Sequence, residues 1–186
     1  MRLEECLKEY IEKKHRDLGI FQYGFITTDR IPVMEEVRKL CEMNSCGLYG
    51  SSWACPPGVG SLDECRKIID AYKHAFVFTT KHDLEDSFDW EGMMEAKERH
   101  VVICDNVHRY VRSLSDEKIL ALSAEGCKRC TKCTYPDAPC RFPEKLTPSI
   151  EALGVQVSLL AKRIGVNYIN GADTVTYFSC ILFSEV

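Results

Sequence analysis

Apolar residues recur at helical spacing in several parts of the chain. Near the start, Leu3, Leu7 and Ile11 are spaced to form one face of a helix over residues 1–18, which Gly19 would end. The same spacing predicts helices over residues 32–43, 88–113 and 147–163, and one that begins at the capping box Ser61-x-x-Glu64. The pattern therefore predicts several amphipathic helices that cover a core.

Stretches typical of β-strands alternate with these helices. They are rich in β-branched and aromatic residues or are continuously apolar. The predicted strands are residues 20–28, 75–80, 119–123, 166–169 and 174–183, with Asn170-Gly171 as a tight hairpin turn between the last two. We expect an α+β fold, with a mixed β-sheet covered by helices in a single domain over residues 1–186.

Composition and charge exclude several classes of protein. The chain has 186 residues with 45% hydrophobic and 28% charged residues, as in ordinary globular domains. Its net charge of -4 gives no electrostatic reason to expect a nucleic acid or an anionic membrane as partner. No stretch reaches the roughly 18 apolar residues of a spanning helix, and the charged start lacks a signal core, so we expect a cytoplasmic protein.

Eleven cysteines are the main departure from average composition. In a reducing compartment they indicate metal or redox chemistry and not a disulfide framework. Seven of them fall in two loops, at about residues 41–60 and 125–146, where glycines and prolines disfavour helix and strand. These two loops are the candidate metal-binding segments.

The second loop carries the set Cys127, Cys130, Cys133 and Cys140. The run C-x2-C-x2-C is the spacing with which bacterial ferredoxins hold a 4Fe-4S cluster, although here the fourth cysteine follows after six residues and not three. Zinc is the alternative, yet structural zinc sites usually present two separated C-x2-C pairs. The spacing favours an iron-sulfur cluster over zinc.

The first loop carries the set Cys41, Cys46 and Cys55, which predicts a second metal site. Cys65 is a further candidate ligand, but the helical stripe after Ser61 places it in the core. In the alternative interpretation, Cys41 and Cys65 are both core residues and only two cysteines are exposed. Whether a second cluster exists depends on which interpretation holds.

The remaining cysteines are expected in the core. Cys6 and Cys180 lie on apolar faces of a predicted helix and strand. Cys104 and His108, four apart on the long helix, could share a metal, but such residues are more often packed and hydrogen-bonded.

Taken together, the motifs resemble a known protein family. They are V-R-K-L-C-x4-C-x2-Y-G-x2-W-x-C-P-P from Val37, G-C-x2-C-x2-C-x6-C-R-x-P from Gly126, and P-S-I-E-A-x-G-V from Pro148. The chain thereby resembles an uncharacterised prokaryotic family of cysteine-rich, predicted metal-binding proteins of unknown function. The resemblance covers most of the chain and implies metal or iron-sulfur binding at the cysteines, without supplying a reaction.

Three functions fit these features. The first is a 4Fe-4S protein in electron transfer, acting as a redox accessory to a partner protein. The second is an enzyme that uses an open iron at the three-cysteine set as a Lewis acid. The third is a structural or regulatory module that binds zinc. The chain lacks the C-x3-C-x2-C motif of radical chemistry on S-adenosylmethionine and the glycine-rich motifs of nucleotide binding.

Overall fold

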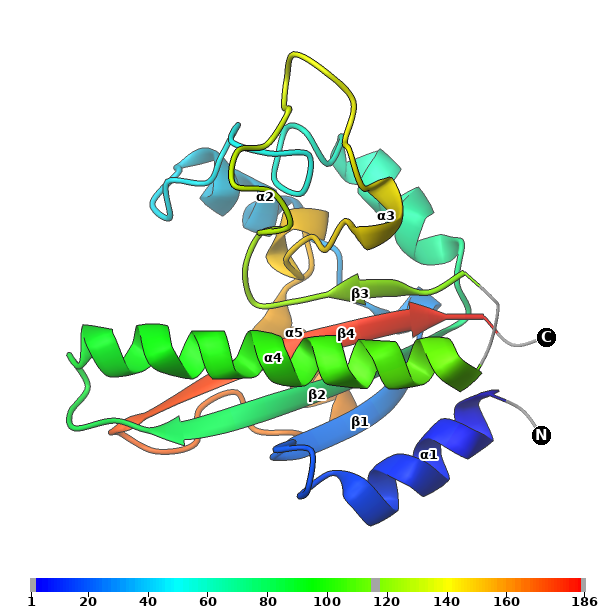
Figure 1. Cartoon of the computed structure of the whole chain (residues 1–186), viewed down its shortest axis with the longest axis vertical. Coiled ribbons are helices and arrows are strands. Elements are labelled where there is room, and N and C mark those ends of the chain that lie inside the picture. The colour runs from blue at the N-terminus through cyan, green and yellow to red at the C-terminus, as the bar shows by residue number, and fades with distance from the viewer. Residues whose placement is uncertain (1–2, 115–117, 185–186) are drawn as a thin grey trace.

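The computed structural model describes residues 3–114 and 118–184 and has an α+β fold, as the sequence predicts (Figure 1). The helices are α1 (Leu3–Lys14), α2 (Glu35–Glu42), α3 (Leu62–Asp70), α4 (Trp90–Leu114) and α5 (Val157–Ile164). The strands are β1 (Gln22–Thr27), β2 (His74–Asp83), β3 (Leu120–Leu122) and β4 (Thr174–Phe183). Short 3-10 turns are η1 (Thr28–Arg30), η2 (Pro143–Lys145) and η3 (Glu151–Leu153).

The strands form one sheet in the order β1-β2-β4-β3. Every neighbouring pair is antiparallel, whereas the order of helices and strands in the sequence predicts a mixed sheet. Strand direction follows from long-range pairing, which local residue patterns do not encode. The ten-residue strands β2 and β4 form the centre of the sheet and pair along their whole length.

Helices cover both faces of this sheet. Figure 1 shows α4 lying across the near face, beside α1, and α5 behind the strands. Alternate residues of β2 enter the two cores: Phe76 and Phe78 join α1 and α4, whereas Ala75 and Val77 join α3 and α5. All four side chains are fully buried, which explains the continuous apolar run in this strand.

The predicted C-terminal hairpin is wrong. Residues 166–169 form no strand, and Tyr168 and Ile169 are exposed. On that side of β4 the strand β3 pairs only with Cys180–Leu182. The 166–169 segment is held elsewhere: the Val166 amide donates to the Ala161 carbonyl oxygen of α5, and the Asn167 amide donates to the Gln22 side chain of β1.

The helix predicted over residues 147–163 is interrupted. Gly154 adopts a left-handed conformation, with φ of 78°, and ends η3, so that α5 begins only at Val157. Before η3, the chain runs beside β3: the Ser123 amide donates to the Pro148 carbonyl oxygen. The predicted end of the helix at Gly165 is confirmed, since that residue caps α5 with φ of 75°.

Two other predicted helices are shorter than expected. The Met34 amide donates to the Gly154 carbonyl oxygen, and the Gln156 amide donates to the Pro32 carbonyl oxygen. This pairing keeps the backbone before α2 extended, which removes the first turn of the helix predicted over residues 32–43. The helix predicted over residues 1–18 ends at Lys14, and its first two residues lie outside the described part of the chain.

Other sequence predictions are confirmed. The capping box forms, with the Ser61 hydroxyl accepting from the Glu64 amide and the Glu64 carboxylate accepting from the Ser61 amide. Cys65 and Cys180 are buried in the core, as expected. Within the described residues, no helix combines the length and the apolar character needed to cross a membrane.

Replacing Gly154 by alanine should destabilise the fold more than the same change at Gly165. Both glycines have positive φ, which costs an L-residue about 1–2 kcal/mol. A Cβ at Gly165 would meet open space, whereas one at Gly154 would overlap the Leu62 side chain. We expect Gly154→Ala to cost at least about 1 kcal/mol more in the free energy of unfolding, measured in urea. Equal losses would contradict this packing argument.

Candidate metal centre

The two cysteine loops lie together at one end of the molecule, beyond the edge strand β3 (Figure 1). The indole Nε1 of Trp53, in the first loop, donates to the carbonyl oxygen of Ala138, in the second, at 3.0 Å. The Trp53 ring also meets the Tyr135 ring edge-on, with centroids 4.9 Å apart. These contacts make one structural unit of segments about 85 positions apart in sequence.

The predicted four-cysteine set gathers around one narrow cavity. Each of the four side chains is half-buried, and the Trp53 ring forms part of the wall. The cysteines that line this cavity are Cys127, Cys130, Cys133 and Cys140. Four soft thiolate donors suit zinc or an iron-sulfur cluster.

The sulfur of Cys133 lies in surroundings that favour a thiolate. Burial acts to raise its pKa, but backbone hydrogen bonds from Tyr135, Trp53 and Thr134 and the charge of Arg141 together lower it. The Arg141 guanidinium is held beside the loop by a 2.9 Å hydrogen bond to the Lys132 carbonyl oxygen. Since the thiolate is the form that binds metal, this cysteine is prepared for ligation.

The predicted three-cysteine set lines a second, wider cavity of about 560 Å³. Cys41 lies on the last turn of α2, Cys46 is exposed in the loop, and Cys55 is buried. Burial raises the pKa of Cys41 and of Cys55, and the neighbouring Cys46 thiol adds to both shifts. These two side chains therefore hold their protons without a metal, and metal binding would release them.

Cys65 does not line this cavity. Its sulfur accepts a hydrogen bond from Arg38 Nη2 at 3.2 Å, within the core between α3 and η3. The same guanidinium also donates to the carbonyl oxygens of Gly60 and Ala152. Cys65 thus helps to hold Arg38 behind the first loop, and the set at the wider cavity numbers three cysteines.

The two cavities adjoin at Gly126. A Cβ built on this glycine would lie 3.1 Å from the Cys55 sulfur. The charges of Cys127 and Cys133 contribute to the raised pKa of Cys55, so the two cysteine sets lie within electrostatic range. Within the described residues, no three metal-binding side chains converge on the position of a single ion. The sulfurs instead lie around the walls of the two cavities.

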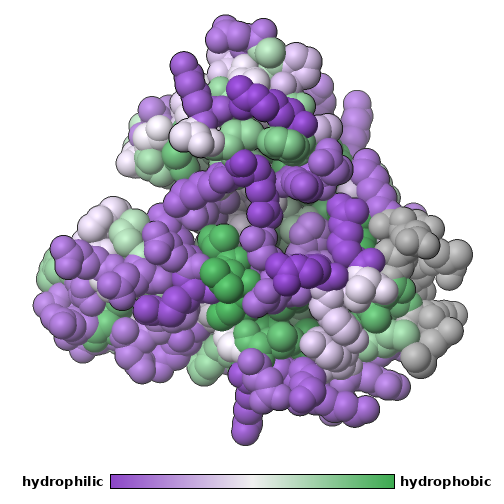
Figure 2. Space-filling model, viewed as in Figure 1, coloured by the Kyte–Doolittle hydropathy of each residue, from purple (hydrophilic) through white to green (hydrophobic). Residues whose placement is uncertain are grey.

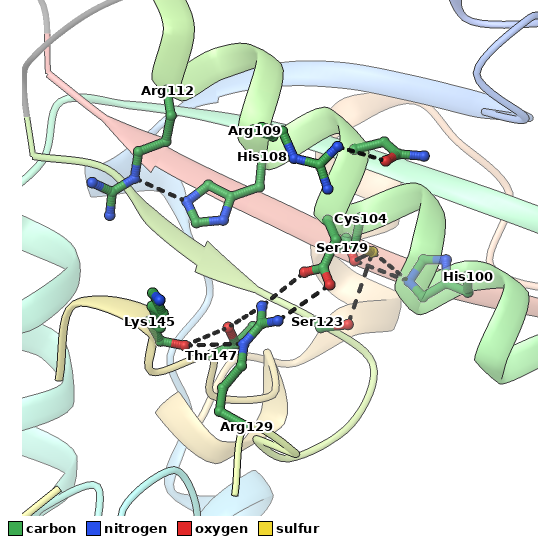
Figure 3. A network of polar contacts seen from close by, with 12 residues as sticks. His100, Cys104, His108, Arg109, Arg112, Ser123, Arg129, Lys145, Thr147 and Ser179 are labelled. Atoms are coloured by element: carbon green, nitrogen blue, oxygen red, sulfur yellow. Dashed lines mark hydrogen bonds and ion pairs between the residues drawn. The ribbon is translucent and has the colours of Figure 1, made fainter. Parts of the chain in front are cut away.

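An ion pair that the sequence analysis missed fastens the second loop to α4 (Figure 3). Arg129, between the first two cysteines of the set, donates to both carboxylate oxygens of Asp105, at 2.7 and 3.2 Å. Arg129 Nε also donates to the Lys145 carbonyl oxygen at 3.3 Å. Such two-point geometry fixes the guanidinium plane, and with it the loop.

Cys104 and His108 do not act as a pair. The Cys104 sulfur lies 2.6 Å from Ser179 Oγ and 3.3 Å from His100 Nε2, inside the interface between α4 and the sheet. Burial raises the pKa of Cys104 to about 12, so this thiol stays protonated. The interpretation of Cys104 as a packed, hydrogen-bonded residue is confirmed, although its partner is His100 and not His108.

His100 is fully buried and belongs to a directional chain of hydrogen bonds. Its Nε2 lies 3.3 Å from the Phe178 carbonyl oxygen, which can only accept, so Nε2 carries the hydrogen. Its Nδ1 then accepts from the Thr80 hydroxyl at 2.9 Å, and Thr80 Oγ1 accepts from His82 Nε2 at 3.0 Å. This series of hydrogen bonds runs from the half-buried His82 through Thr80 and His100 to Ser179 and Cys104.

Comparison with known proteins gives one match. The family model described as "Predicted metal-binding protein (DUF2284)" matches residues 24–183, a range that includes both cysteine sets. No curated protein matches the chain. No solved structure matches it either.

Acidification should destabilise the fold through His100. Burial lowers the pKa of this residue from 6.5 to about 4, so the folded state favours the neutral ring. The stabilisation from the neutral ring is fully present above the pKa of His100 in the unfolded chain, 6.5. It is lost as the pH falls toward the pKa of His100 in the folded protein, about 4. Between about pH 7.5 and about pH 5, we expect a loss of about 2 kcal/mol in the free energy of unfolding.

Urea denaturation at both pH values would measure this loss. The variant His100→Gln should lack this share of the pH dependence, because the amide does not titrate. His15→Gln, which changes a histidine outside the buried chain of hydrogen bonds, should keep it. A His100→Gln protein with the pH dependence of the parent would show that another group is responsible.

Proposed function

The chain belongs to the DUF2284 family of predicted metal-binding proteins, and from that premise we propose that it is an iron-sulfur protein of electron transfer. A 4Fe-4S cluster would be held by Cys127, Cys130, Cys133 and Cys140, with a second metal centre at the three-cysteine set. When bound, a fully cysteine-ligated cluster supplies one-electron transfer. The carrying observation is the arrangement of the four cysteines around one cavity.

The spacing of these cysteines favours a cluster over zinc. Structural zinc sites usually present two separated C-x2-C pairs. Each cysteine of a cubane ligates a different iron, and bacterial ferredoxins hold three irons with a C-x2-C-x2-C run. Cys127, Cys130 and Cys133 form such a run, and Cys140 lines the same cavity.

The residues around the cavity would tune such a cluster. Backbone hydrogen bonds to the Cys133 sulfur and the Arg141 charge stabilise negative charge at this ligand. Hydrogen bonds to cluster sulfurs and local charge are the means by which proteins set reduction potentials. The Trp53 ring covers one side and limits access of water.

We propose that a redox protein docks at this end of the molecule. Four of the exposed large apolar side chains in the described residues lie in or beside the two cysteine loops. They are Leu40, Met43, Leu48 and Phe142. Exposed apolar residues beside a redox centre suit a transient partner that must approach closely.

A second candidate function is catalysis at the three-cysteine set. It is favoured by the size of the wider cavity, about 560 Å³, and by its charged lining of Lys97, Glu125, Lys128 and Glu151. Three cysteines leave one iron of a cubane without a protein ligand, and an open metal position acts as a Lewis acid. Added ligands that change the spectrum of this centre would support catalysis; an unchanged spectrum would favour simple electron transfer.

Metal analysis tests the proposal directly. For protein purified without oxygen, we expect about four to eight irons and as many acid-labile sulfides per chain, with absorbance near 400 nm and bleaching by dithionite. Plasma emission spectroscopy and a sulfide assay on one sample would measure this. Zinc without sulfide or colour would overturn the proposal and would support the alternative of a structural or regulatory module that binds zinc.

Substitution of single cysteines tests which residues hold the metal. Cys130→Ala should lose the cluster of the four-cysteine set, about four irons per chain, because one iron loses its ligand. Cys180→Ala is the matched control: its side chain is buried in β4 and should cost only about 1–2 kcal/mol of stability, with metal content unchanged. Equal iron loss in both variants would show that the assignment of ligands is wrong.

A further inference from the structure

A groove runs between α4 and the second cysteine loop, and the candidate metal ligands account for only one of its walls. It consists of two adjoining cavities of about 260 and 480 Å³, which share Asp105, His108 and Arg129. On the face in Figure 2, the surface is hollowed between α4 and the loops, and hydrophilic side chains surround the hollow. We call these two cavities together the α4 groove.

The outer end of the α4 groove carries an excess of positive charge. Its charged side chains are four basic and two acidic residues: Arg109, Arg112, Arg129 and Lys145 against Asp105 and Glu144. Asp105 is occupied by its two-point ion pair with Arg129. In a chain of net charge -4, this local excess needs a reason.

The other three basic side chains contact only neutral groups in the described part of the chain. Arg112 donates to His108 Nε2 at 3.4 Å and to the Glu144 carbonyl oxygen at 3.3 Å. Arg109 donates to the amide oxygen of Asn106, and Lys145 Nζ lies over the Phe142 ring. A guanidinium group has five N–H donors, and neutral acceptors leave its charge uncompensated. Arg109 and Arg112 therefore keep N–H donors and positive charge available to bind an oxyanion.

The pKa of His108 reflects the same excess of positive charge. Burial lowers the pKa of this histidine, and the charges of Arg112 and Arg129 lower it further, against the opposing effect of Asp105. Figure 3 shows His108 and Arg112 on α4, facing Lys145, Thr147 and Arg129 across the groove. Cationic groups thus approach the groove from both sides.

The inner end of the α4 groove is small and partly apolar. Phe78, Leu122 and Ile181 line it beside three buried polar side chains. These are Cys104, Ser123 and Ser179. They are hydrogen-bonded within the protein, Ser123 to the Cys104 sulfur and Ser179 to Cys104 and His100. A hydroxyl oxygen has two lone pairs, so the two serines that line the cavity can also accept a hydrogen bond from a ligand. Cys127, a candidate cluster ligand, lies in the same wall.

We propose that the α4 groove binds a small organic oxyanion, a carboxylate or a phosphate ester. Its anionic group would lie among Arg109, Arg112 and Lys145, and its organic part would reach toward Ser123 and Ser179. A protein surface could not enter the inner cavity of about 260 Å³, which favours a small molecule. The site brings its ligand beside Cys127, and it does not depend on which metal the cysteines hold.

Calorimetry with simple probes tests this site. Inorganic phosphate, propyl phosphate and butyrate would be titrated into the metal-loaded protein. We expect saturable binding of at least one organic probe. Propyl phosphate should bind at least about fourfold more tightly than inorganic phosphate, the gain expected if one CH₂ of the propyl chain is buried. The ratio of propyl phosphate to butyrate distinguishes a phosphate from a carboxylate site.

Two arginines on the same helix give a matched pair of variants. Arg112→Gln should weaken binding of the tightest probe about tenfold, the loss expected for one charge-assisted hydrogen bond. Arg99→Gln removes an exposed arginine of α4 that pairs with Glu95, outside the groove, and should leave binding unchanged. Circular dichroism would verify that both variants fold.

The result that overturns the proposal is an absence of saturable binding by all three probes. Equal binding by Arg112→Gln and Arg99→Gln would also overturn it, because the anion would then bind elsewhere, for example at an open metal position. Iron and sulfide content would be measured on the same preparation. A protein that holds iron and sulfide but binds no probe would overturn the groove proposal and leave the iron-sulfur proposal standing.

Discussion

Seven cysteine sulfurs at one end of a small protein are held together against their own electrostatics. As thiolates they would repel one another, and burial raises the pKa of Cys41 and Cys55. Backbone hydrogen bonds and the positive charge of Arg141 lower the pKa of Cys133. A bound metal would remove this conflict, because it neutralises the thiolates and releases the protons that burial retains. Metal binding at these cysteines would therefore stabilise the arrangement.

The scaffold supplies the rigidity that this gathering of cysteines requires. The central strands β2 and β4 are buried on both faces, and α4 lies along the sheet with the Arg129–Asp105 ion pair fastening the second loop to it. The first loop is fastened in turn through Trp53 and its contacts with Ala138 and Tyr135. Each loop is therefore positioned by the other and by the sheet, although only Cys41, at the end of α2, lies in regular secondary structure among the seven cysteines.

Local patterns in the sequence predicted what depends on local chemistry. The 25-residue helix α4, the capping box and the buried strand β2 follow from periodicity and from short-range hydrogen bonds. The grouping of cysteines into two sets also agrees with the two cavities, although metal binding itself stays a prediction. The C-terminal hairpin failed because the Asn170-Gly171 signal cannot report that the segment before it is held against β1 by the hydrogen bond from the Asn167 amide to Gln22, 145 positions earlier. The His100–Ser179 contact and the Arg129–Asp105 ion pair were missed for the same reason, since they join residues distant in sequence.

Gly126 is the single residue that separates the two cysteine sets. Its Cα faces the Cys55 sulfur of one set, and the next residue is Cys127 of the other. A metal that moved Cys127 would also shift Gly126 against the Cys55 sulfur, so that occupancy of one set would alter the affinity of the other. Thermodynamic linkage makes this influence equal in both directions. The two centres would therefore fill as a coupled pair, and the order in which metals arrive would not change the total binding free energy.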